Sequence, residues 1–162
     1  MKKETKTNAA RLLDRAGIAY TLVPYEVDES DLSAVHVAEQ LGTDPKTLFK
    51  TLVLRGDRSG VFICLIPGDA ELDLKKAAKA SGNKKAELVP MKELLPLTGY
   101  IRGGCSPVGM KKQYPTWIDS TAVTHSLICI SAGIRGLQIR IEPSALIRFL
   151  HAGIESLTLS PD

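Results

Sequence analysis

The stretch that most constrains the fold is LFKTLVLRGDRSGVFICLIP, residues 48–67. Two apolar runs, rich in residues that favour strands, flank the short polar segment GDRSG at 56–60. A glycine-bounded polar segment between two such runs is typical of a turn. The sequence therefore predicts two consecutive strands joined by a turn, which commits the chain to a fold built on a β-sheet.

The elements predicted around this pair mix helices with strands. Further strands are expected at 18–25, 116–119, 126–131 and 137–142, and helices at 9–16, 34–42, 71–82, 90–99 and 143–150. Asp31 or Ser33 would cap the helix at 34–42, and Leu74, Ala77 and Ala78 would form the inner face of the next one. Because these elements do not alternate regularly, a doubly wound sheet is disfavoured. We expect an α+β fold in which one domain, 1–162, packs its helices outside a sheet or barrel.

The net charge and the cysteine content limit the classes of protein to which this chain can belong. The net charge of +3 permits contact with a polyanion without requiring it. Cys64, Cys105 and Cys129 are odd in number and lack CxxC spacing, which argues against a disulfide framework and a cysteine-rich zinc site. Cys64 and Cys129 stand in apolar runs and should be buried. With no signal peptide or membrane-spanning run predicted, we expect a cytoplasmic protein.

Residues 98–112, TGYIRGGCSPVGMKK, raise the question of chemistry. Cys105 could be a nucleophile, a redox group, or a residue that only fills space in a backbone-lined pocket. A nucleophilic cysteine needs a nearby base, and none of His36, His125 and His151 stands in a recognisable base motif. Ser106 fails the nucleophile-elbow pattern because Val108 occupies the second glycine position. The spacings also provide no metal-ligand or phosphate-loop motif, so no metal or cofactor is expected.

Three features remain as candidates for a site. Lys50 begins an apolar strand between Phe49 and Leu52, and its side chain could face either a cleft or solvent. Gly103 and Gly104 could let backbone amides approach a ligand, or could simply form a turn. The third feature is another glycine-rich segment, ISAGIRG at 130–136, which begins at the end of a predicted strand. Each feature is weak when taken alone.

Taken together and in this order, the segments resemble a known family. LFKTLV, LDLKKAAKASGNKKAELV, TGYIRGGCSPVGMKK and ISAGIRGL are similar to the signature segments of the YbaK/EbsC family of aminoacyl-tRNA deacylases, which is related to the editing insertion of bacterial prolyl-tRNA synthetases. The resemblance runs from about Ala10 to the final predicted strand. It implies a compact α+β fold on a mixed, barrel-like sheet, and trans-editing hydrolysis of mischarged tRNA, foremost Cys-tRNA(Pro).

The resemblance also implies roles for individual residues. The family's essential lysine falls on Lys50 and its loop glycine on Gly103, which become the candidate catalytic residues. Matching positions and their neighbours make up the candidate substrate-binding set: Tyr25, Phe49, Thr51, Gly104, Ser106, Pro107, Ser131 and Gly133. The candidate tRNA-binding residues come from two lysine-rich stretches: Lys75, Lys76, Lys79, Lys111 and Lys112. This chain departs from the family pattern at 26–36 and at Gln138, where some members carry aspartate.

The implied mechanism uses the thiol of the substrate. That sulfur would attack its own ester carbonyl, close a thiolactone in a lyase-like release, and need only orientation by Lys50 and by the amides of Gly103 and Gly104. Cys105 would then be a small wall residue. Two alternatives stay open: a deacylase for another small aminoacyl group, such as Ala-tRNA(Pro), and a non-catalytic regulatory or RNA-binding module. The partners implied are tRNA(Pro) and prolyl-tRNA synthetase.

Overall fold

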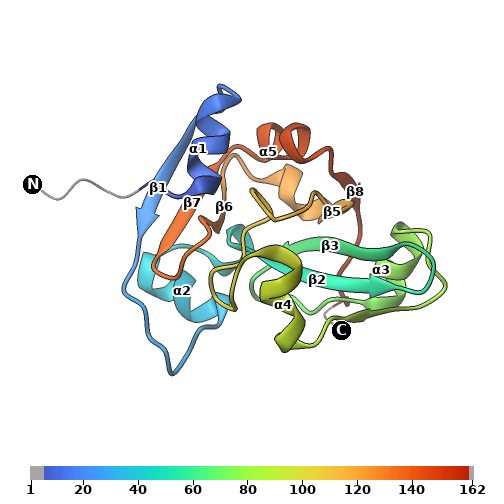
Figure 1. Cartoon of the computed structure of the whole chain (residues 1–162). Helices are drawn as coiled ribbons and strands as arrows, with labels where there is room; N and C mark the ends of the chain where they lie inside the picture. Colours follow the sequence, from blue (N-terminus) through green and yellow to red (C-terminus); the bar gives the residue numbers. More distant parts are fainter. Residues whose placement is uncertain (1–5, 161–162) are drawn as a thin grey trace, which may run out of the picture.

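The computed structural model describes residues 6–160, and its elements are traced in Figure 1. The α-helices are α1 (Asn8–Arg15), α2 (Ala34–Leu41), α3 (Leu74–Ala80), α4 (Met91–Thr98) and α5 (Pro143–Leu150). The strands are β1 (Tyr20–Pro24), β2 (Phe49–Gly56), β3 (Gly60–Pro67), β4 (Ala86–Leu88), β5 (Thr116–Asp119), β6 (Ile128–Ser131), β7 (Leu137–Ile141) and β8 (Gly153–Glu155). Two short 3₁₀ helices, η1 (Pro45–Thr47) and η2 (Ser120–Thr124), complete the set.

The strands form two sheets. One has three antiparallel strands in the order β1-β7-β6, and the other is mixed, with the order β4-β2-β3-β5-β8. A parallel bridge between Leu48, just before β2, and Cys129 in β6 connects them. The predicted α+β class, with helices around a mixed barrel-like arrangement of strands, is confirmed. The structure adds that the strands divide into two sheets, which meet where β2 begins.

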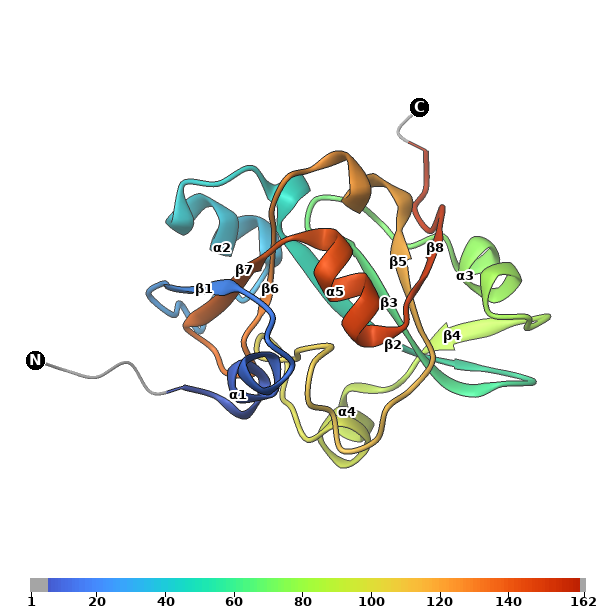
Figure 2. The same cartoon turned by 90° about the horizontal axis from the view of Figure 1, so that it is seen from above.

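The main core lies between the two sheets. Phe49 and Val53 of β2 pack there with Ile139 and Ile141 of β7, while α1 and α5 close the ends through residues such as Leu146. Figure 2 shows α5 lying over the space between β6 and β7 on one side and β3 and β5 on the other. Each of these fully buried side chains stabilises the fold by about 1.5–3 kcal/mol relative to its exposed state.

The position of β3 in the fold explains why its sequence, VFICLIP, is apolar throughout. Ile63 and Leu65 of β3 face the main core, whereas Phe62, Cys64 and Ile66 face a second cluster on the other side of the sheet. Alternate residues of a strand point to opposite faces, so a strand covered on both sides needs apolar residues throughout. Helix α3 covers one face of β3 through Ala77, and the three-stranded sheet covers the other through residues such as Ile130 and Ile139.

Local sequence signals explain where several helices begin and end. The Ser33 side chain caps α2 by accepting a hydrogen bond from the His36 amide, and Gly42 ends the helix with a φ of 65°. Helix α3 begins three residues later than predicted, at Leu74, after its cap Asp73. Ala77 and Ala78 are buried as expected, but the expectation for Leu74 is wrong: it is 42% exposed because the first turn of α3 leaves it on the solvent side.

Asn83 holds together the end of the β2–β3 hairpin, far along β2 from Lys50. Its side-chain oxygen accepts hydrogen bonds from the amides of Arg58 and Ser59, and its nitrogen donates to the hydroxyls of Ser59 and Ser81. The residue is buried. This side chain therefore provides the polar partners that the turn and the end of α3 would otherwise lack.

We predict that Asn83→Ala lowers the free energy of unfolding by about 1–3 kcal/mol, because two turn amides lose their acceptor. Urea denaturation would measure the change. The control is Gln113→Ala, which also removes a side-chain amide but at an exposed position. An Asn83→Ala protein as stable as the control would contradict the assigned role.

Candidate functional site

A pocket of about 360 Å³ lies where the two sheets meet. Its walls come from the start of β2, the loop and first turns leading into α2, the glycine loop after α4, and one residue each from β6 and β7. The lining residues are Tyr25, Leu32, Ser33, Ala34, Val37, Leu48, Phe49, Lys50, Thr51, Leu52, Gly68, Arg102, Gly103, Cys105, Ser131 and Gln138. These residues come from segments that are far apart in the sequence. They lie together because the Leu48–Cys129 bridge brings β2 against β6.

The pocket contains six of the ten candidate catalytic and substrate-binding residues: Tyr25, Phe49, Lys50, Thr51, Gly103 and Ser131. Of the two orientations left open for Lys50, the structure has the one that faces a cleft. The Lys50 ammonium is partly buried and donates a hydrogen bond to the Gly68 carbonyl at 3.4 Å. Burial lowers the pKa of Lys50 from its ordinary value, and Asp69 and Glu71 oppose the change. The pocket therefore holds a partly desolvated cation.

Gly103 and Gly104 differ in their surroundings. Gly103 lines the pocket with a φ of 84°, a conformation that residues with a side chain rarely adopt. The Gly104 amide instead donates to the Ile101 carbonyl at 2.9 Å within a turn. Arg135 packs against this turn and donates from Nε to the Arg102 carbonyl at 2.8 Å. The Gly104 amide is thus occupied within the protein, and only Gly103 of the pair faces the pocket.

The other three candidates, Ser106, Pro107 and Gly133, lie outside the pocket lining. Ser106 is fully buried, and its hydroxyl accepts a hydrogen bond from the Val108 amide. Pro107 lines a separate hollow. The Gly133 amide donates to the Ser131 hydroxyl, and any side chain at Gly133 would collide with the ring of Tyr100. These residues shape the two glycine-rich loops around the site.

Cys105 lines the pocket as a protonated thiol. Burial raises its pKa to about 11, against a small opposing effect of a hydrogen bond with Thr98. Among the described residues that line the pocket there is no histidine, aspartate or glutamate that could deprotonate it. Cys64 and Cys129 are buried and free, as predicted. The site therefore provides no activated nucleophile of its own.

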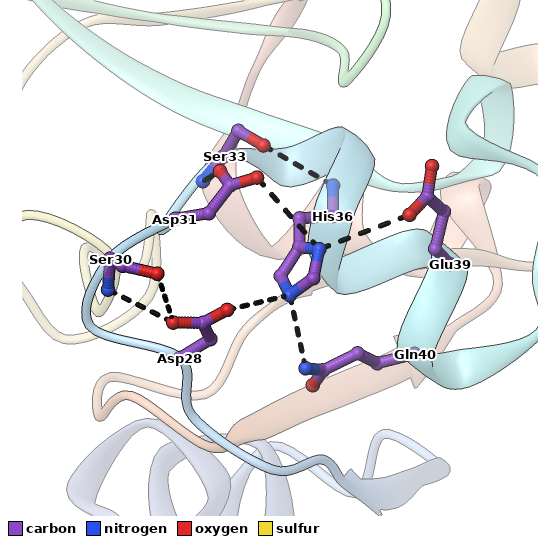
Figure 3. Close-up of polar contacts among 7 residues, drawn as sticks. All are labelled: Asp28, Ser30, Asp31, Ser33, His36, Glu39 and Gln40. Carbon is purple, nitrogen blue, oxygen red and sulfur yellow. Dashed lines mark hydrogen bonds and ion pairs between the residues drawn. The ribbon is translucent and has the colours of Figure 1, made fainter.

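The wall formed by Leu32 and Ser33 belongs to an acidic loop that folds on itself (Figure 3). Asp28 accepts hydrogen bonds from the amide and hydroxyl of Ser30, and Asp31 accepts one from the amide of Ser33. These bonds lower the pKa of both carboxyl groups. The loop is consequently a series of tight turns with its carboxylates fixed in place.

The same loop is attached to α2 through His36. Its ring Nε2 lies 3.4 Å from Asp28 Oδ2, and Nδ1 lies 3.8 Å from Asp31 Oδ2. Glu39 and Gln40, one turn further along α2, also contact the ring, as Figure 3 shows. His36 thus anchors the loop whose end forms one wall of the pocket.

The candidate tRNA-binding lysines do not form one surface around the pocket. Lys75, together with Lys84 and Lys85, borders a hollow at the opposite end of β2 from Lys50, beside Arg55. The Lys76 ammonium is held internally, because it donates to the Thr158 carbonyl at 2.7 Å. Lys79 is exposed on the same helix, whereas Lys111 and Lys112 are exposed after the glycine loop.

Sequence reasoning missed several residues that line the pocket. Arg102 stood beside the candidate glycines, and Gln138 was noted only as a departure from the family pattern. Leu32 and Ser33 belong to the acidic loop, whose position against β2 has no local signal. The two polar residues of the strand segment LQIRI, Gln138 and Arg140, alternate with apolar ones and were the available sign that β7 has a face turned away from the core.

Comparison with known proteins agrees with this geometry. The family model described as "Aminoacyl-tRNA editing domain" matches residues 29–149. The chain belongs to the aminoacyl-tRNA editing domain family. The match includes every pocket residue except Tyr25.

Individual relatives of this editing-domain protein extend the comparison. An Enterococcus faecalis protein named "Putative Cys-tRNA(Pro)/Cys-tRNA(Cys) deacylase EbsC" is 46% identical over 157 residues, covering 97% of this chain and 96% of the relative. The proline–tRNA ligase of Cupriavidus necator is 31% identical over 76% of this chain and 22% of its own length. A crystal structure of "a putative trans-editing enzyme for prolyl tRNA synthetase" has a TM-score of 0.82 at 24% identity, covering 96% of this chain and all of its own, which shows the shared fold.

Two further observations concern residues 6–160. None of the helices in this range is long and apolar enough to cross a membrane. No group of three or more histidine, cysteine, aspartate or glutamate side chains within it is arranged to hold a metal ion.

We predict that Cys105 is alkylated slowly at neutral pH, because a pKa of about 11 leaves almost all of the thiol protonated. Its reaction rate with iodoacetamide should keep rising to at least about pH 10, whereas a model cysteine peptide with a pKa of about 8.5 should level off earlier. Mass spectrometry of the Cys105 peptide would follow the reaction. A rate that levels off together with the model peptide would contradict the raised pKa, and one that levels off at a lower pH would show an activated thiol.

Proposed function

We propose that this protein is a trans-acting deacylase that hydrolyses cysteine from mischarged tRNA(Pro), with the thiol of the substrate as the attacking group. The observation that carries the proposal is a small pocket that combines a partly buried cation with a glycine, and whose cysteine, Cys105, is not activated. Membership in the editing-domain family, and the name of the 46% identical relative, support the substrate class.

The size of the pocket suits an aminoacyl group. Its volume of about 360 Å³ lies at the lower end of the range of about 300–1,000 Å³ typical of small-molecule sites. Apolar side chains such as Leu48 and Val37 provide much of the wall, and Lys50 and Arg102 are the charged lining residues. A compact, weakly polar side chain beside an ester carbonyl matches this composition.

The chemical step requires orientation more than activation. The cysteinyl sulfur attacks the carbonyl carbon of its own ester, forming a small thiolactone ring and releasing the ribose oxygen of the terminal adenosine, which takes up the proton lost by the thiol. Water then opens the thiolactone to free cysteine. Holding the reacting atoms in a near-attack geometry can provide about 7–11 kcal/mol. In this proposal the Gly103 amide stabilises the developing oxyanion, worth about 3–4 kcal/mol for one such donor.

Lys50 binds and positions the ester rather than attacking it. Within residues 6–160 its ammonium has one acceptor, the Gly68 carbonyl, at the long distance of 3.4 Å, which leaves it able to contact a ligand oxygen. Since the burial that lowers its pKa opposes the charged form, substrate oxygens that restore hydrogen bonds to the ammonium are bound favourably. This arrangement favours a positioning contact with the carbonyl, the ribose or the terminal phosphate.

We predict that Lys50→Met lowers kcat/KM for Cys-tRNA(Pro) by about 10- to 150-fold, the loss expected for one hydrogen bond to a charged group. The unfolding temperature should not fall, because the variant removes a partly desolvated charge. Release of cysteine and alanine from separately charged tRNA(Pro) would be measured side by side. Cys-tRNA(Pro) should be the better substrate, because alanine carries no thiol.

The matched control is Cys105→Ala in the same pocket, which should keep most of the deacylase activity because its thiol stays protonated. An inactive Cys105→Ala enzyme together with an active Lys50→Met enzyme would overturn the mechanism. Equal release of cysteine and alanine would overturn the role of the substrate thiol.

Binding of the tRNA body is assigned to the exposed lysines of α3 and the segment after it. Lys75, Lys84 and Lys85 lie together with Arg55 at one end of the five-stranded sheet, where they could contact phosphates of the acceptor arm. The chain is similar in sequence to part of proline–tRNA ligase. We propose prolyl-tRNA synthetase as the partner that selects the tRNA, and the cytoplasm as the place where the two act.

We predict that Lys84→Ala combined with Lys85→Ala raises KM for charged tRNA severalfold and leaves kcat unchanged. The affinity for tRNA should also fall less steeply with salt concentration, by the amount expected for the loss of up to about two phosphate contacts. Lys76→Ala is the contrasting variant. Since Lys76 is bonded to the C-terminal segment, its loss should lower stability instead. An unchanged salt dependence in the double variant would exclude this surface from tRNA binding.

A further inference from the structure

The pocket contains two buried oxygens that the protein leaves without a partner. Thr51 Oγ1 and Gln138 Oε1 are the buried side-chain polar atoms in residues 6–160 that have no hydrogen bond, and both residues line the same pocket. An unpaired buried polar group costs about 1–3 kcal/mol of stability, so folded proteins retain few of them. Two such atoms in one pocket indicate that a bound ligand provides the missing partners.

Gln138 is placed there by the pattern of β7. Leu137, Ile139 and Ile141 point into the main core, so Gln138 lies on the opposite face of this central strand. It pairs in register with Ser131 of β6, another lining residue, and is only 5% exposed. An apolar side chain at this position would leave no polar group unpaired, so the fold alone gives no reason for glutamine.

The chemistry of the two atoms restricts the ligand group that they can bind. An amide oxygen can only accept a hydrogen bond, so a ligand group that pairs with the Gln138 oxygen must be a donor. Phosphate and ester oxygens cannot do this, and they are better matched to the cationic groups of Lys50 and Arg102. In an aminoacyl ester, the α-amino group carries N–H donors on the carbon next to the ester carbonyl.

We propose that Gln138 is the residue that recognises the free α-amino group of the aminoacyl ester, with Thr51 as a neighbouring polar contact to the same ligand. Gln138 is then a specificity-determining residue, and the enzyme discriminates against esters that lack the amino group. This inference rests on the proposed deacylase function and adds to it a requirement for the amino group. It also explains why the pocket keeps an amide oxygen that weakens the fold.

The test combines a variant of the enzyme with a variant of the substrate. Gln138→Met keeps the length of the side chain and removes both polar atoms. tRNA(Pro) charged with 3-mercaptopropionate keeps the thiol and removes the amino group. We expect Gln138→Met to lower kcat/KM for Cys-tRNA(Pro) by about tenfold, as for one lost hydrogen bond, and to change it less than about twofold for the 3-mercaptopropionyl ester.

Stability separates recognition from a structural role. If Gln138 serves the ligand, Gln138→Met should unfold at the same or a higher temperature than the wild type, because an unpaired polar group has been removed. Gln113→Met, which makes the same change at an exposed position, should alter neither activity nor stability. If Gln138→Met does not fold, Gln138→Asn gives the same substrate comparison, because it withdraws the amide by one methylene group.

The outcomes distinguish the two proposals. Wild-type protein that fails to deacylate Cys-tRNA(Pro) overturns the proposed function, and the recognition of the amino group with it. Active wild-type protein whose Gln138 variant loses equal activity toward both esters, or toward neither, overturns the inference about Gln138 alone.

Discussion

The site depends on one junction, the parallel bridge between Leu48 and Cys129. It places the first residues of β2 against β6, so that Lys50 and Thr51 of one sheet share a pocket with Ser131 and its pairing partner in the other. The remainder of β2 is held by the hairpin with β3 and by the core on both faces of that sheet. Because both sheets are rigidly packed, the pocket between them needs little further support.

The interior of the pocket is less favourable for folding than its surroundings. It holds a lysine whose charge is disfavoured by burial, and two oxygens that have no hydrogen-bond partner within residues 6–160. Each of these groups weakens the folded state slightly and becomes favourable when a ligand provides the complementary group. In contrast, burial does not disfavour Cys105, because its thiol is neutral there. This contrast separates the groups that bind substrate from the one that fills space.

Much of the fold followed from local patterns, and the reasons are visible in particular elements. The apolar runs around GDRSG became β2 and β3, TWID became β5 residue for residue, and PSALIRFL became α5 with its proline in the first turn. The short strands β4 and β8 were missed because each has only three residues and pairs at a sheet edge. Such strands are defined by their neighbours rather than by their own sequence.

The chain's amino acids alone established the α+β class, the hairpin, the candidate Lys50 and the family resemblance, because strand, turn and motif signals act over short distances along the chain. Which candidates share a pocket depended on packing between distant segments. In the packed structure Lys50 faces a cleft and Gln138 lines it. The Gly104 amide is bonded within a turn, and Ser106 and Pro107 lie outside the pocket lining. The pocket brings together residues more than a hundred positions apart in the chain, such as Tyr25 and Gln138, and no local pattern encodes such a distance.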